Sequence, residues 1–70
     1  MALLKITHRN GLVTVIDPHE IAEMMFDDGA EELHCRWTYK SGHIQSMYGA
    51  VPRALWDWVH SGEPDVTVYK

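Results

Sequence analysis

The pair Asn10-Gly11 constrains the fold of this chain more than any other feature, because it stands between two short strand-like runs. Asparagine followed by glycine supplies the two positive-φ positions of a type I′ turn, which joins the strands of a tight β-hairpin. With that two-residue turn, Arg9 pairs with Leu12 and the other pairs follow in register. The apolar side chains then share one face of the hairpin, and they are Leu4, Ile6, Val13 and Val15.

A second hairpin is predicted around Ser41-Gly42, with Leu33 to Lys40 entering the turn and His43 to Tyr48 leaving it. Apolar residues alternate with polar ones along the entering strand, as in a half-buried strand. Pairing Tyr39 with Ile44 extends the apolar face across both strands. That face carries Leu33, Cys35, Trp37 and Tyr39, and the polar face that should meet water carries His34, Arg36, Thr38 and Lys40.

The segment between the two hairpins begins with Asp17-Pro18-His19-Glu20, which is typical of a helix start. Asp17 is a favourable N-cap, and proline is favourable at the first helical position. Ile21, Met24 and Met25 then share one helical face, and Asp27-Asp28-Gly29 ends the segment. The pattern favours a short helix here, and a bent third strand is the alternative.

A further helix is predicted to open at Val51-Pro52 and to end at Ser61-Gly62. Its apolar stripe consists of Val51, Ala54, Leu55, Trp58 and Val59. The tail from Asp65 to Lys70 is β-prone and forms a short edge strand or stays loose. The prediction is therefore an α+β fold, in which two antiparallel hairpins form a sheet of four to five strands with one or two short helices packed on one face.

Composition limits the class of protein. Seventy residues with 46% hydrophobic content form one core, so residues 1–70 are expected to be a single domain. Cys35 has no second cysteine to pair with, which favours a reducing, cytoplasmic setting. The net charge of −4 disfavours nucleic acid as a ligand. A run of about 18 apolar residues is missing, and the start MALLKIT is too briefly apolar for a signal peptide, so no membrane association is expected.

Five histidines and one cysteine raise the question of a zinc site. His34 and Cys35 are adjacent on a strand and point to opposite faces, and neither C-x-x-C nor H-x-x-x-H occurs. Cys35 shares its face with Trp37, so we expect it to be buried and inert rather than nucleophilic. The carboxylates around Gly29 are expected to form a solvated loop. The sequence predicts no catalytic residue, no metal and no cofactor, and hence a protein that is not an enzyme.

Large apolar side chains outnumber the positions that one small core offers. Trp56 lies around its helix from the apolar stripe, beside Arg53, and tryptophan is enriched at interface hot spots. Met24, Met25 and Phe26 cannot all face one core from a short helix. The predicted interaction residues are Trp56, Arg53 and Phe26. They suggest a non-enzymatic protein-interaction module that binds a host protein or self-associates as a homodimer.

A characteristic series of segments occupies the second half of the chain: Trp37, Lys40-Ser41-Gly42, Tyr48-Gly49-Ala50-Val51-Pro52 and Trp56 through Ser61-Gly62. The series resembles the KTSC-type small domain, a family named for an extension on some lysyl-tRNA synthetases that also occurs as short stand-alone bacterial proteins. The family has Tyr-x-Tyr before its Val-Pro helix start. Here Tyr48 matches the second tyrosine, and Ser46 stands in place of the first.

The KTSC resemblance implies RNA as an alternative ligand, because RNA binding has been suggested for that family. The residues expected to contact RNA are His34, Arg36, Lys40, His43 and Tyr48. In the first half, the Asn10-Gly11 hairpin followed by Ile16-Asp17-Pro18 and Ile21 is similar to small flagellar FlbD-type proteins. The short, acidic, cysteine-poor chain also resembles accessory proteins of phages and prophages, which often act by binding one host protein.

Overall fold

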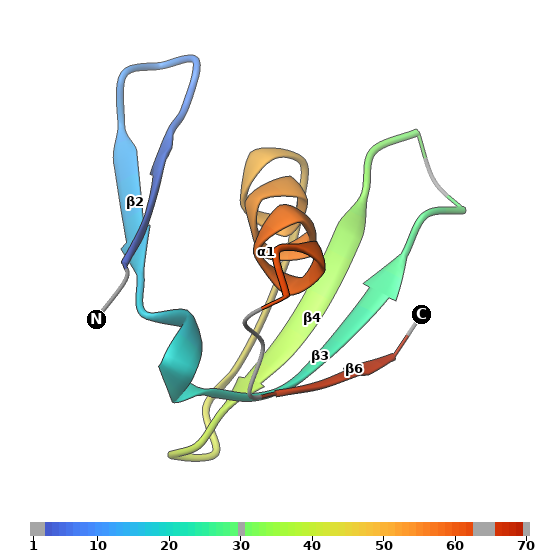
Figure 1. The fold of residues 1–70 in the computed structure, drawn as a ribbon. Helices are drawn as coiled ribbons and strands as arrows, with labels where there is room; N and C mark the ends of the chain where they lie inside the picture. The colour runs from blue at the N-terminus through green and yellow to red at the C-terminus, as the bar shows by residue number, and fades with distance from the viewer. Residues whose placement is uncertain (1–2, 30, 63–65, 70) are drawn as a thin grey trace.

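The structure is a computed structural model that describes residues 3–29, 31–62 and 66–69. Its strands form two sheets with a helix between them (Figure 1). The elements in chain order are β1 (Leu4–Thr7), β2 (Val13–Ile16), the 3-10 helix η1 (Pro18–Glu20), β3 (Ile21–Asp27), β4 (His34–Tyr39), β5 (Ile44–Tyr48), α1 (Ala50–His60) and β6 (Thr67–Tyr69). The α+β class is as predicted.

The two hairpins do not share one sheet. β1 and β2 form a separate two-stranded ribbon, and the larger sheet has the order β5-β4-β3-β6. β3 takes the place beside β4, where it runs antiparallel, and β6 runs parallel to β3 at the edge. The C-terminal segment therefore forms an edge strand over Thr67–Tyr69, whereas Asp65 and Lys70 of the predicted tail lie outside the described residues.

The first hairpin turns through three residues rather than two. The His8 amide donates to the Leu12 carbonyl at 2.8 Å, and the Gly11 amide donates to the His8 carbonyl at 3.0 Å. Gly11 has φ of 87°, and among the described residues only glycines have positive φ, so the predicted type I′ turn is wrong. The loop Arg9, Asn10 and Gly11 instead matches the three-residue hairpin loop with glycine at its left-handed position. The Asn10 side chain accepts from the Leu12 amide at 3.0 Å.

The longer loop shifts the register by one residue and turns β2 over. Leu4 pairs with Ile16 and Ile6 with Thr14, so Ile16 enters the core. Val13 and Val15 point outward instead, with 48% and 57% of their surfaces exposed. The predicted apolar face is correct for β1 and wrong for β2.

The second hairpin repeats this arrangement. The Tyr39 amide donates to the His43 carbonyl at 2.8 Å, and Gly42, with φ of 97°, closes the loop. The alternation along β4 is confirmed, because Cys35 and Trp37 are fully buried. The pairing of Tyr39 with Ile44 is wrong, since Ile44 pairs with Thr38. β5 is therefore turned over as well, and Ile44 and Tyr48 lie on the outer face, away from the core.

The predicted helix after Asp17 is a single 3-10 turn, and the bent strand is the alternative that forms. Asp17 caps this turn as predicted, because its carboxylate accepts from the His19 amide at 3.0 Å. β3 then contains a bulge between Ile21 and Glu23. A bulge inserts one extra residue, so Ile21 and Met24 face the core together although they are three residues apart. This bulge explains why the sequence imitates a helical stripe.

The core lies between α1 and the inner face of the larger sheet, and the ribbon closes its open side (Figure 1). α1 ends before Ser61 and buries the predicted stripe, although Ala54 and Val59 are only partly covered. The core residues are Ile6, Ile16, Ile21, Met24, Phe26, Cys35, Trp37, Val51, Leu55 and Trp58. None of the described helices combines the length and the apolar character that crossing a bilayer requires.

Candidate interaction surfaces

Exposed apolar side chains gather on two surfaces of the described structure. Four of the seven large ones belong to the β1–β2 ribbon, and we call them the ribbon surface: Val13 and Val15 on its outward face, Leu3 just before β1, and Leu12 at the turn, on the same side of the ribbon as His8. The other three lie on the face of the larger sheet that points away from α1, which we call the outer sheet face: Met25, Ile44 and Tyr48.

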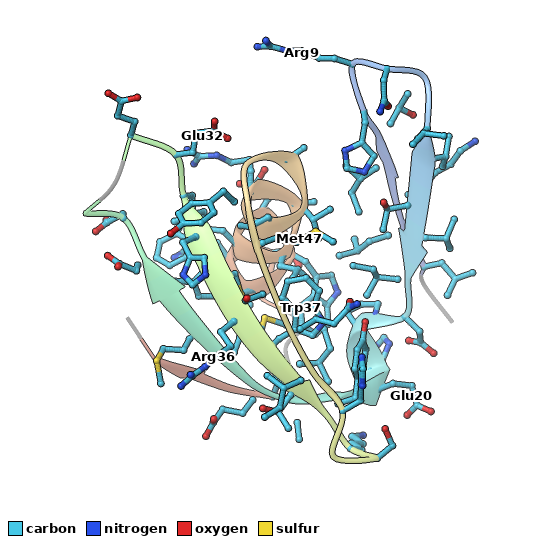
Figure 2. All side chains as sticks on the ribbon, turned by 180° about the vertical axis from the view of Figure 1, so that it is seen from behind. Arg9, Glu20, Glu32, Arg36, Trp37 and Met47 are labelled. Carbon is cyan, nitrogen blue, oxygen red and sulfur yellow. The ribbon has the colours of Figure 1, made fainter. Side chains whose placement is uncertain are left out.

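The ribbon surface is apolar and basic. Val13 lies opposite Thr7, and Val15 lies opposite Lys5. Residues 3–16 contain Lys5 and Arg9 and no carboxylate, although the whole chain carries ten acidic residues. Figure 2 shows Arg9 at the tip of the ribbon and Glu20, the last residue of η1, at its base. The ribbon is thus a projecting element with a basic tip and an acidic base.

The register set by the longer loop places His8 and Thr14 together on the inner side of the ribbon. His8 and Thr14 both point inward, and the His8 ring nitrogen Nε2 lies 2.7 Å from the Thr14 hydroxyl. The pair satisfies two polar groups that are only partly exposed. The ribbon surface was missed from the sequence because the two-residue turn assigned Val13 and Val15 to the core.

The outer sheet face brings together three of the residues predicted to contact RNA. The rings of His34 and Tyr48 pair across β4 and β5, with centroids 4.6 Å apart. Arg36 extends over β3, where its guanidinium lies 3.9 Å from the sulfur of Met25. Carboxylates share this face, because the register also places Glu23 and Asp27 there.

Lys40 and His43 lie at the β4–β5 turn, beyond the paired part of these strands. The His43 ring stacks on Tyr39 with a centroid distance of 6.0 Å. The predicted RNA patch is therefore divided into a group on the sheet and a group at the turn.

The three predicted protein-contact residues do not form one surface. Phe26 is 2% exposed and belongs to the core, so its prediction as a surface contact is wrong. Trp56 is half-buried and packs edge-on against Phe26, with centroids 4.9 Å apart. It also packs on the ring of His60, with a centroid distance of 4.2 Å. Arg53 is exposed, and Met25 is the residue of the Met-Met-Phe run that faces solvent.

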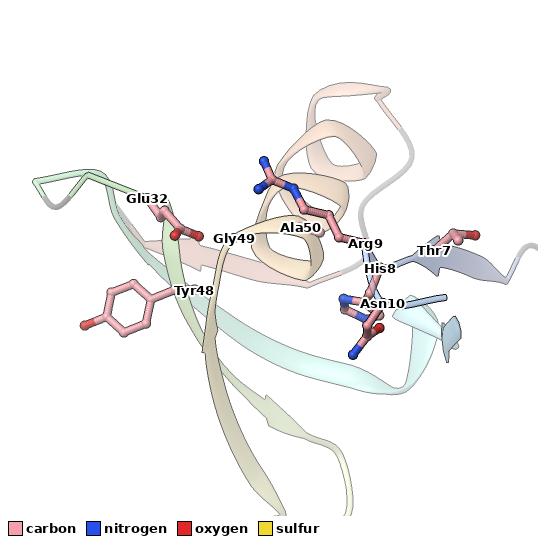
Figure 3. Close-up of a pocket in the computed structure, with 8 residues that line it drawn as sticks. All are labelled: Thr7, His8, Arg9, Asn10, Glu32, Tyr48, Gly49 and Ala50. Atoms are coloured by element: carbon pink, nitrogen blue, oxygen red, sulfur yellow. The ribbon is translucent and has the colours of Figure 1, made fainter. Parts of the chain in front are cut away.

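An open cleft of about 730 Å³ separates the tip of the ribbon from the start of α1 (Figure 3). The ribbon contributes His8, Arg9 and Asn10, and the body contributes Glu32 and Tyr48. The Glu32 carboxylate lies near the N-terminal end of α1, where a negative charge is favourable. Sequence reasoning did not find this cleft, because its two walls come together only through tertiary packing.

Cys35 is fully buried, and desolvation by that burial raises the pKa of its thiol to about 12, which disfavours the reactive thiolate. The predicted burial of Cys35 is confirmed. Within residues 3–29, 31–62 and 66–69, no three His, Cys, Asp or Glu side chains are grouped so that they could hold a metal ion.

Comparison of the chain with protein-family models, with curated proteins and with solved structures found no match. The resemblances to KTSC-type, FlbD-type and phage accessory proteins therefore stay predictions.

Proposed function

We propose that this protein is a non-enzymatic protein-interaction module and that it binds its partner through the ribbon surface. The supporting observation is the concentration of exposed apolar side chains on a ribbon of only two strands. A two-stranded hairpin is marginally stable alone, and an apolar patch on such an element marks a place where another surface packs. The buried, unpaired Cys35 fits a reducing compartment such as the cytoplasm.

Magnitudes indicate what kind of contact the ribbon makes. Fully burying a Val or Leu side chain contributes about 1.5–3 kcal/mol, so covering four half-exposed ones contributes about 3–6 kcal/mol. Association costs about 4–15 kcal/mol in lost freedom. The apolar contact alone is therefore insufficient, and the partner must also satisfy polar groups of the ribbon.

The test compares two lysine substitutions in the same cross-strand pair. Val13→Lys places a charge on the ribbon surface at β2, and Thr7→Lys places the same charge opposite it on β1. Proteins captured by the tagged full chain, including untagged copies of the chain itself, should be retained by the wild type and by Thr7→Lys and lost with Val13→Lys. Equal capture by all three folded proteins, or no capture by the wild type, would contradict the proposal.

A second candidate function is binding of single-stranded RNA on the outer sheet face, favoured by the pair of rings formed by half-buried His34 and exposed Tyr48 beside Arg36. Unpaired bases stack on aromatic rings and on the guanidinium of arginine. Glu23 and Asp27 on the same face oppose a polyanion. Fluorescence anisotropy with a labelled oligoribonucleotide tests this candidate. Binding should weaken with added salt and in Arg36→Gln, and no binding at low salt rules it out.

A further inference from the structure

The proposed function leaves the partner unspecified, and the free edge of β2 identifies one. We propose that the partner is a second copy of this chain, and that β2 of each copy pairs antiparallel with β2 of the other across a two-fold axis at Thr14. The inference rests on the proposed function, because it assigns the partner of the same ribbon.

The first argument is the chemistry of the edge. β2 has the sequence Val-Thr-Val-Ile, which is uncharged, entirely β-branched and free of proline. Among the described strands it pairs with β1 alone, so its other edge is open. Proteins ordinarily protect such an edge with lysine, proline, a bulge or a covering element. An unprotected edge with high β-propensity is complementary to another extended strand.

The second argument is the direction of the backbone groups. The Leu12 carbonyl accepts from His8 on β1, and backbone groups alternate in direction along a strand. Thr14 and Ile16 therefore also turn their amides and carbonyls toward β1, whereas Val13 and Val15 turn theirs toward the open edge. A partner strand must consequently form its hydrogen-bonded pairs with Val13 and Val15.

The third argument is the register. A two-fold axis perpendicular to the ribbon requires one residue of β2 to lie opposite itself. With Thr14 on the axis, Val13 lies opposite Val15 of the second copy, and these are the residues whose backbone groups are free. Leu12, which is 66% exposed, then lies opposite Ile16 of the second copy.

The neighbouring registers are worse. An axis at Val15 sets Val13 opposite Asp17, and an axis at Val13 sets Val15 opposite Gly11. Only the axis at Thr14 gives each exposed apolar residue of β2 and its turn an apolar partner. Because this axis is perpendicular to the ribbon, the rotation keeps the inner face of each ribbon packed against its own chain.

The fourth argument is charge. Antiparallel pairing places the basic tip of each ribbon, with Arg9, beside the acidic base of the other, with Asp17 and Glu20. Figure 2 shows Arg9 and Glu20 at these two ends of the ribbon. The two chains each carry a net charge of −4, and between these ends the paired strand, residues 12–16, contains no carboxylate. The ribbon is therefore electrostatically complementary to a second copy of itself. The combined sheet has the order β1-β2-β2-β1. It therefore has four strands, whereas a sheet of only two strands is marginally stable.

A cross-link at the axis tests the register. Thr14 lies opposite itself in a pair that is not hydrogen-bonded, where Cα atoms are about 4.5 Å apart, within the range of a disulfide. Mild oxidation of the full-length Thr14→Cys variant should give a covalent dimer. Thr7→Cys, on β1, is the control and should stay monomeric; the native Cys35 is buried in both. A Thr14→Cys variant that cross-links no faster than Thr7→Cys overturns the proposal.

Sedimentation equilibrium tests the backbone pairing. Val15→Pro removes an amide that faces the open edge and leaves the β1–β2 ladder intact, as proline is tolerated on the solvent side of an edge strand. The wild type and Val15→Thr should dimerise alike, and Val15→Pro should dissociate about 10- to 100-fold more readily, because two intermolecular bonds are lost. If Val15→Pro is unfolded by circular dichroism, the Thr14→Cys result decides.

The outcomes separate this inference from the proposed function. A wild type that is monomeric at all concentrations overturns self-pairing. In that case the proposed function of the ribbon still holds if the wild type and Thr7→Lys capture a different protein and Val13→Lys does not.

Discussion

Glu32 and Gly49 lie so close that a Cβ added to Gly49 would stand 2.7 Å from the Glu32 carboxylate oxygen Oε2. Gly49 also has φ of 94° and is the single residue between the end of β5 and the start of α1. Its amide donates to the Leu33 carbonyl at 2.9 Å, which fixes the strand-to-helix corner against β4. The backbone conformation is the main reason that glycine is required at this corner, because the Glu32 carboxylate ends an exposed, flexible side chain that can move away from an added Cβ.

Substituting this glycine tests the backbone conformation. Gly49→Ala should destabilise the fold by about 1–3 kcal/mol, because alanine is strained at positive φ. The double variant with Glu32→Ala should recover little of this loss, because the exposed Glu32 side chain can already move aside. Thermal or urea denaturation measures both. Equal stability of Gly49→Ala and the wild type would contradict the corner geometry.

The first turn makes unequal demands on Asn10 and Gly11. Gly11 has φ of 87° and open space around it, so Gly11→Ala should destabilise by about 1 kcal/mol through backbone strain alone. Asn10 has no positive φ, and Asn10→Ala should lose only the side-chain bond to the Leu12 amide, about 0.5–1 kcal/mol. Asn10→Val tests the turn type most directly, since a β-branched residue is severely strained at positive φ. A large loss of stability in Asn10→Val would support the two-residue turn instead.

Cys35 should react with thiol reagents far more slowly in the native protein than in urea, because the side chain is buried and its pKa is raised from 9.0 to about 12. The raised pKa also predicts a pH dependence. Below pH 9 the thiol is protonated in both the folded and the unfolded chain, so it does not make the free energy of unfolding depend on pH. As the pH rises from 9 toward 12, the unfolded chain loses this proton first, so the free energy of unfolding should fall.

Denaturation curves of Cys35→Ala provide the control for that pH dependence. Between pH 9 and pH 12 the free energy of unfolding of this variant should fall less than that of the wild type, because the contribution of the thiol is absent. Native labelling of the wild type at the rate of the unfolded chain would place Cys35 at the surface.

The two neighbouring tryptophans of α1 should respond differently to truncation. Trp58 is 6% exposed, and Trp58→Ala should destabilise by about 3–5 kcal/mol. Trp56 is half-buried against Phe26, and Trp56→Ala should destabilise by about 1–2 kcal/mol, mainly through the lost ring contact. Sedimentation of Trp56→Ala should match that of the wild type. Weaker association in this variant would instead support the role in binding that its place on the helix suggested.

Strongly periodic elements could be predicted from the sequence, and elements whose register depends on a loop could not. The stripe on α1 and the alternation of β4 each repeat over several residues, so one misplaced residue does not change them. β2 and β5 were assigned the wrong faces because each loop contains one more residue than the turn motif suggested. In both hairpins the glycine is the last residue of a three-residue loop.

Two other errors have tertiary causes. The bulge at Ala22 gives Ile21 and Met24 a helical spacing, and a bulge leaves no simple signature in sequence. β4 pairs with β5 on one side, so only its other side can pair with a further strand. β3 pairs there, which leaves the ribbon outside the larger sheet. The candidate RNA residues on β4 were assigned to the correct face. The ribbon surface was missed because it depends on the register of β2.

The separation of the two sheets has a consequence for how the molecule unfolds in parts. The ladder of β1 and β2 shares no strand with the ladder of β5-β4-β3-β6, and η1 is the chain segment that joins them. Opening of the ribbon therefore breaks few contacts of the larger sheet, and its amide protons should exchange with solvent at a lower free energy than those of β3 and β4. The ribbon is a local folding unit, and whatever covers it changes the protection of residues 4–16 while leaving the central strands as they were.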